Sequence, residues 1–60
     1  MNAGLIEVGQ IIKIDGTEAE VASNETILGE FGFFTRITAK SNGQEVTLEI
    51  QPHKGVEVIA

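Results

Sequence analysis

The sequence contains no cysteine and only one histidine, His53. Disulfide bonds, thiolate metal sites and cysteine nucleophiles are therefore excluded, and a single histidine cannot build a histidine-rich metal site within one chain. Domains of this length are marginally stable and usually gain stability from a disulfide, a metal or a second subunit. Because only the last of these is left, we expect a homo-oligomer that holds no metal and no cofactor.

Long apolar runs are also absent, and the N-terminus lacks the basic region and apolar core of a signal peptide. The sequence therefore predicts a soluble protein without a membrane partner. We expect it in the cytoplasm, or in a virion if the chain is of phage origin.

Positive charge is scarce. Four Lys and Arg residues stand against nine Asp and Glu residues, which gives a net charge of −5, and neither sign forms a run. Phosphate backbones are bound through clustered Lys and Arg side chains. Nucleic acid is therefore not an expected partner of this acidic chain.

β-Branched residues are abundant: the chain has thirteen Ile and Val residues and five Thr, against three Leu. Such side chains are stiff at χ1 and suit a pleated sheet. Residues Glu45 to Ile50 alternate strictly between polar and apolar, and the Asn42-Gly43 pair before them is a strong signal for a hairpin turn. We predict a hairpin from about Phe33 to Ile50.

Before this hairpin, the apolar residues from Leu5 to Ile14 predict one long first strand, with a bulge or a sharp bend at Gly9. Residues Thr17 to Val21 then alternate as in a strand. Thr17 and Glu20 also have the spacing of a helix capping box, so a short helix from Thr17 to Ser23 is the alternative in this region.

The remaining segments are shorter. Gly, Asp and Pro residues predict turns or connections at 15–16, 29–32 and 51–55, a polar loop is expected at 23–25, and short strands are expected at 26–28 and 56–59. Five or six strands at this spacing, without a crossover helix, predict an all-β fold. We expect a single domain over residues 1–60, a small antiparallel barrel that is SH3-like or OB-like.

The only aromatic residues are Phe31, Phe33 and Phe34. The segment from Phe31 to Phe34 resembles the central four residues of the strand motif on which RNA-recognition and cold-shock proteins stack bases. Glu30, which precedes it, would repel phosphate, and the chain has no second aromatic motif. We expect instead that Phe33 packs in the barrel with Ile37, and that Phe31 or Phe34 closes an end of the barrel or meets a neighbouring subunit.

Binding of single-stranded nucleic acid is the alternative function. Phe31 and Phe34 would stack on bases and Arg36 would contact phosphate, provided that an oligomer, Sm-like or OB-like, gathers several such weak sites.

No catalytic arrangement is evident. The carboxylates alternate with apolar residues and so point to solvent, His53 lies in a predicted exposed loop, and neither serine sits in a nucleophile elbow. A barrel of this size has no interior for a substrate. We predict no enzyme activity and no catalytic residue.

The sequence therefore predicts a non-catalytic, self-associating structural or protein-interaction module, such as a ring subunit, an adaptor or a virion component. Its expected partners are itself and another protein. The first strand has apolar residues on both faces, and the last strand has little charge or proline to protect an exposed edge. From these patterns the predicted oligomer interface consists of Leu5, Ile11, Phe34, Val56, Val58 and Ile59.

Overall fold

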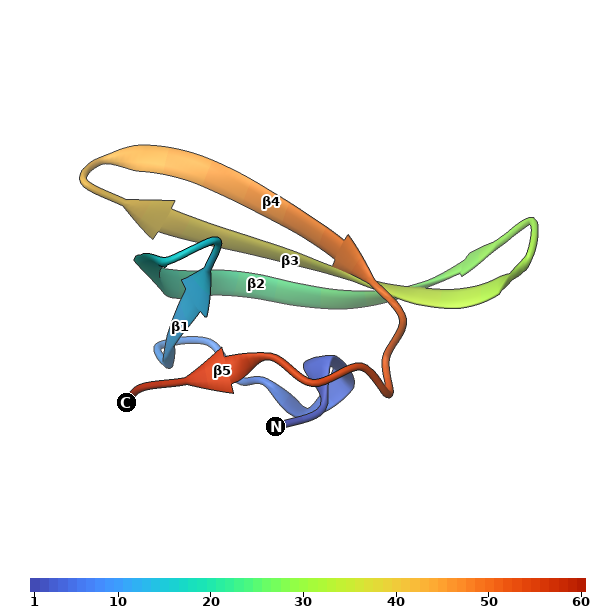
Figure 1. The fold of residues 1–60 in the computed structure, drawn as a ribbon. Coiled ribbons are helices and arrows are strands. Elements are labelled where there is room, and N and C mark those ends of the chain that lie inside the picture. The colour runs from blue at the N-terminus through green and yellow to red at the C-terminus, as the bar shows by residue number, and fades with distance from the viewer.

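The computed structural model describes all 60 residues, and five antiparallel strands form one sheet (Figure 1). The strand order across the sheet is β4-β3-β2-β1-β5. A short 3₁₀ turn precedes the strands, and the elements in chain order are η1 (Ala3–Leu5), β1 (Ile11–Ile14), β2 (Thr17–Gly29), β3 (Gly32–Ser41), β4 (Gln44–Ile50) and β5 (Glu57–Val58). The prediction of an all-β, antiparallel fold is confirmed.

Three tight turns connect β1 to β4, and two of them share one geometry. Asp15-Gly16 joins β1 to β2 with φ angles of 49° and 79°, and Asn42-Gly43 joins β3 to β4 with φ angles of 52° and 77°. Positive φ at both central positions is the type I′ geometry, whose twist matches that of the strands. Both predicted turns are confirmed, as is the hairpin that ends where Thr35 pairs with Ile50.

β2 runs over 13 residues without a break. Its first part pairs with β1, and from Glu20 onward it pairs with β3, with a register shift between Val21 and Ser23. Such a β-bulge bends and twists a strand. The strand predicted at 17–21 is confirmed over the alternative helix, whereas the loop predicted at 23–25 is wrong, because these residues pair with β3.

The predicted long first strand is also wrong, since only β1 forms near its end. Gly9 has a φ of 94°, and the chain before it leaves the sheet. The Ala3 amide donates to the Lys54 carbonyl (2.8 Å), and Asn24 Nδ2 donates to the carbonyls of Ala3 (3.0 Å) and Ile6 (2.7 Å). Long-range hydrogen bonds thus replace strand pairing in the N-terminal segment, residues 1–6.

The core lies between the curved sheet and the N-terminal segment. Its central cluster draws on the N-terminal segment, three strands and the connection before β5: Ala3, Ile6, Ile12, Val21, Ile37 and Val56. Half-buried side chains pack against this cluster from the margins: Ile14, Leu48, Ile50 and Val58. All nine carboxylate side chains are exposed, as the alternation predicts.

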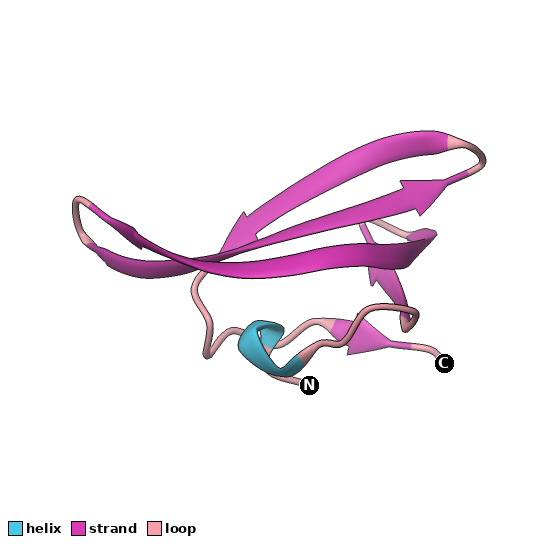
Figure 2. Cartoon of the chain, turned by 180° about the vertical axis from the view of Figure 1, so that it is seen from behind, coloured by secondary structure: helices cyan, strands magenta, loops and turns pink.

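The sheet is open, so the predicted closed barrel is not confirmed. β4 and β5 form its two edges. Residues 51–56, which connect them, hydrogen-bond to the N-terminal segment instead of bridging the two edges. β5 has two residues, fewer than the predicted 56–59, and pairs only with β1. Figure 2 shows η1 and β5 side by side beneath the long strands.

Candidate interaction surface

β2 and β3 extend past the rest of the sheet as a two-stranded ribbon (Figures 1 and 2). β4 ends where Ile50 pairs with Thr35, and β1 pairs with β2 only as far as Glu20. Residues 27–34, which we call the arm, therefore have no third strand beside them. A ribbon of two strands is marginally stable in water on its own.

One face and the tip of the arm are apolar and exposed. Leu28 and Phe33 are cross-strand partners with 69% and 62% of their surface exposed, and Phe31, in the turn, is 97% exposed. Phe33 shares a face of β3 with the buried Thr35, because side chains two residues apart point to the same side. The prediction that Phe33 packs in the core is wrong, because Thr35 is the last buried residue on this face of β3 before the arm.

The opposite face of the arm is filled by its own side chains. The Phe34 ring lies over Gly29, where a Cβ would come within 3.0 Å of the ring carbon Cε1. An aromatic ring placed over a glycine compensates for the missing side chain. The Arg36 guanidinium carbon lies 5.8 Å from the centroid of the Phe34 ring, and Arg36 Nε donates to Glu49 Oε2 (2.7 Å).

The structure thus brings together two of the three residues predicted for nucleic-acid binding, Phe34 and Arg36, while Phe31 lies in the turn. Carboxylates surround them. Glu25 is the cross-strand partner of Arg36 on β2, and Glu49 pairs with it on β4. Arg36 is therefore already neutralised within the sheet.

The six residues predicted for the oligomer interface divide into three groups by exposure. Leu5 and Ile59 are exposed, by 66% and 44%. Val56 belongs to the core, and Ile11, Phe34 and Val58 are half-buried. Leu28 is not among the residues predicted from the sequence. The signal that could have identified it is its position opposite Phe33 across the turn at 29–32.

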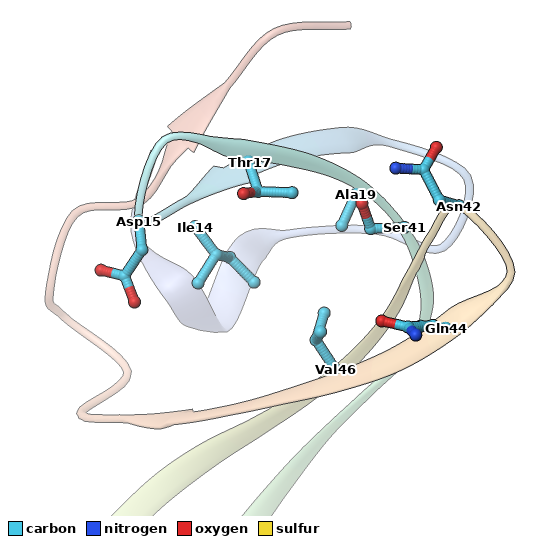
Figure 3. A pocket seen from close by; sticks show the side chains of 8 residues that line it. All are labelled: Ile14, Asp15, Thr17, Ala19, Ser41, Asn42, Gln44 and Val46. Atoms are coloured by element: carbon cyan, nitrogen blue, oxygen red, sulfur yellow. The ribbon is translucent and has the colours of Figure 1, made fainter.

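A depression of about 390 Å³ lies between β4 and the β1–β2 turn (Figure 3). Ile14, Ala19 and Val46 form its apolar part, and Thr17 and Gln44 add a hydroxyl and an amide. It is open to solvent, and none of the residues predicted for an interface lines it.

The structure contains no group of three or more His, Asp or Glu side chains placed to hold a metal ion. It also contains no helix with the length and apolar composition needed to cross a lipid bilayer. Comparison of the chain with protein-family models, with curated proteins and with solved structures found no match.

Proposed function

We propose that this protein is a non-catalytic, self-associating structural or interaction module, and that the arm forms the contact between copies. The observation that carries the proposal is the exposed apolar group of Leu28, Phe31 and Phe33. Burial of a large apolar side chain is worth about 1.5–3 kcal/mol. Apolar groups of this kind on a projecting element are typical of interaction sites.

The N-terminal segment supplies the receiving surface. Leu5 is exposed there, and Lys54, whose carbonyl accepts the Ala3 amide, lies in the adjoining connection. Lys54 is the one Lys or Arg side chain outside the strands. When Phe31 packs on Leu5, Glu30 in the arm turn meets a positive charge. Because this contact joins two different surfaces, two copies can exchange it reciprocally in a dimer, or several copies can join head to tail in a ring or a filament.

The strand order supports a finer description of the fold. β1 to β4 pair in chain order as a meander, and β5 returns beside β1. An OB-like barrel is a Greek key instead. We therefore infer that the sheet is an SH3-like barrel that is open between β4 and β5.

Gel filtration with light scattering at micromolar concentration tests self-association. We expect a mass that is a multiple of 6.4 kDa, and a monomer for the double variant Phe31→Ser/Phe33→Ser and for Leu5→Asp. A mixture of these two variants retains one intact interface and should form a dimer. Val8→Ser, at an equally exposed side chain (67%), is the control and should keep the oligomer. A native protein of 6.4 kDa at all concentrations would contradict the proposal.

Single-stranded nucleic acid has less support as a partner. The contact of Arg36 with Phe34 offers a base-stacking surface, but Glu25 and Glu49 flank Arg36 and oppose phosphate. Submicromolar binding of an oligonucleotide, steeply dependent on salt and weakened by both Phe34→Ala and Arg36→Ala, would favour this function over self-association.

A further inference from the structure

β4 is the long unprotected edge of the sheet. It pairs with β3 along one side over its full length, and no strand lies on its other side. Because a two-residue turn makes its flanking residues a hydrogen-bonded pair, Ser41 and Gln44 bond to each other and the pattern then alternates. The backbone N–H and C=O groups of Glu45, Thr47 and Glu49 therefore point away from β3, outward from the edge and within the plane of the sheet.

Charges are arranged in rows across the sheet. Every cation within a strand stands between two glutamates of the neighbouring strands, and the rows are Glu57–Lys13–Glu18, Glu20–Lys40–Glu45 and Glu25–Arg36–Glu49. Two of these rows end on β4. If this alternation of charge continued onto a strand beside β4, that strand would carry one positive charge opposite Glu45 and another opposite Glu49.

The same rows oppose pairing of β4 with a second copy of itself. A fully overlapped antiparallel pair of β4 strands places Glu45 of one copy opposite Glu49 of the other, twice. Like charges directly opposite each other destabilise a sheet. The β4 edge is therefore protected against pairing with a second copy of itself, but it can pair with a strand that carries positive charge.

The inner face of β4 favours apolar side chains on the added strand. Val46, Leu48 and Ile50 are half-buried on that face, and Val46 lines the open depression opposite Ile14 (Figure 3). Inward side chains of a strand beside β4 would extend this apolar surface. The β4 edge thus favours cations on one face of an added strand and apolar side chains on the other.

We propose that β4 binds, by strand addition, an extended segment of another protein in which Lys or Arg residues lie four positions apart on one face and apolar residues lie on the other. Main-chain hydrogen bonds to Glu45, Thr47 and Glu49 supply affinity, and the two ion pairs and the apolar face supply specificity. This surface and this partner are distinct from self-association through the arm.

The probe is a capped peptide in which valine alternates with lysine, threonine and lysine, so that the lysines meet Glu45 and Glu49 when the threonine lies opposite Thr47. The control peptide has glutamates in place of both lysines. In an NMR titration at low salt, the lysine peptide should bind saturably and slow the exchange of the Glu45, Thr47 and Glu49 amides. The amides of the intervening residues, already bonded to β3, should change little.

Three variants locate the site. Thr47→Pro removes an outward N–H without removing a bond to β3, and should weaken binding about tenfold. Glu45→Gln should weaken it about threefold, and Glu18→Gln, a matched control on β2, should leave it unchanged. The arm variant Phe31→Ser/Phe33→Ser should bind the peptide normally, whatever its oligomeric state.

Equal binding of the glutamate peptide, exchange protection at other amides, or no saturable binding of the lysine peptide at millimolar concentration would each overturn the proposal. If Thr47→Pro does not fold, the exchange pattern of the native protein decides the location.

Discussion

β2 and β3 pair with each other through two regions, the arm and the remainder of the two strands, residues 17–26 and 35–41, which we call the core half. Neighbouring strands lie beside the pair in the core half, and none lies beside it in the arm. In the core half, Val21 and Ile37 are buried beneath the N-terminal segment and between neighbouring strands. In the arm, the same two strands stay paired, yet Leu28 and Phe33 are exposed. Apolar burial is the dominant favourable term in folding, whereas an exposed backbone hydrogen bond adds little net stability. The pairing of the arm is therefore maintained with far less burial than that of the core half.

This difference means that the two regions respond differently to mutation. Strain placed in an element can lower global stability by no more than the free energy needed to open that element locally. We expect this limit to be small for the arm and close to the full unfolding free energy for the core half.

The largest contrast is between Ile37→Ala and Phe33→Ala, two positions on the same face of β3. Ile37 is fully buried, so its truncation should lower the free energy of unfolding by about 2–5 kcal/mol. Phe33→Ala removes a larger side chain from an exposed site and should change it by less than about 0.5 kcal/mol.

Urea denaturation followed by far-ultraviolet circular dichroism measures both effects, because the chain has no Trp or Tyr to report by fluorescence. The background should be Leu5→Asp, in which we expect the arm to be free of a neighbouring copy. Equal losses for the two variants would show that the arm is covered within the monomer.

Turn glycines give a contrast of intermediate size. Gly43, with φ 77°, closes the β3–β4 hairpin, and Gly43→Ala should cost about 1–2 kcal/mol of global stability. Gly32, with φ 114°, lies in the arm, and Gly32→Ala should instead speed amide exchange in the arm with a smaller global loss. Gly55→Ala is the control, since its Cβ meets nothing and its φ lies outside the left-handed region. A larger global loss for Gly32→Ala than for Gly43→Ala would mean that the arm unfolds together with the core half.

Local signals predict the core half well and its connections poorly. The alternation of Glu45 to Ile50 and the turn at Asn42-Gly43 depend on periodicity and on φ, which are properties of the segment itself. The polar residues 23–25 predict a loop, yet they pair with β3, and Asn24 binds the carbonyls of Ala3 and Ile6. Their conformation is decided by partners far away in the chain.

The candidate surfaces show the same limit. Alternation assigns Phe33 to the inner face correctly, but how far that face is covered depends on the N-terminal segment, which packs on β2 and β3 from a distant part of the chain. The charge rows likewise require the register of three strands at once. The sequence therefore identifies the aromatic residues of the arm, but not that they are exposed. It likewise identifies the glutamates of β4, but not the cations that stand opposite them.

The smallest of the three contrasts is between Thr35 and Thr38 on β3, and Thr35 lies where the core half meets the arm. Its side chain is fully buried, and its Oγ1 has no hydrogen-bond partner. A buried, unpaired hydroxyl costs about 1–3 kcal/mol, and valine has nearly the same shape and the same preference for strands. Thr35→Val should therefore raise the free energy of unfolding by about 1 kcal/mol.

In a domain of this size, that gain corresponds to a rise of about 4–8 °C in the midpoint of thermal unfolding. Thr38→Val is the matched control on the opposite face of β3, where Thr38 is half-buried and pairs with Thr47. The Thr38 hydroxyl is not a buried group without a partner, so removing it should bring no comparable gain in stability. If Thr35→Val lowered the midpoint, the hydroxyl would have a hydrogen-bond partner in solution. If it raises the midpoint as expected, the hydroxyl is unpaired, and Thr35 buries a polar group that the core does not satisfy. Phe33, the preceding residue on the same face of β3, is already exposed, so this unpaired group lies at the last buried position before the arm.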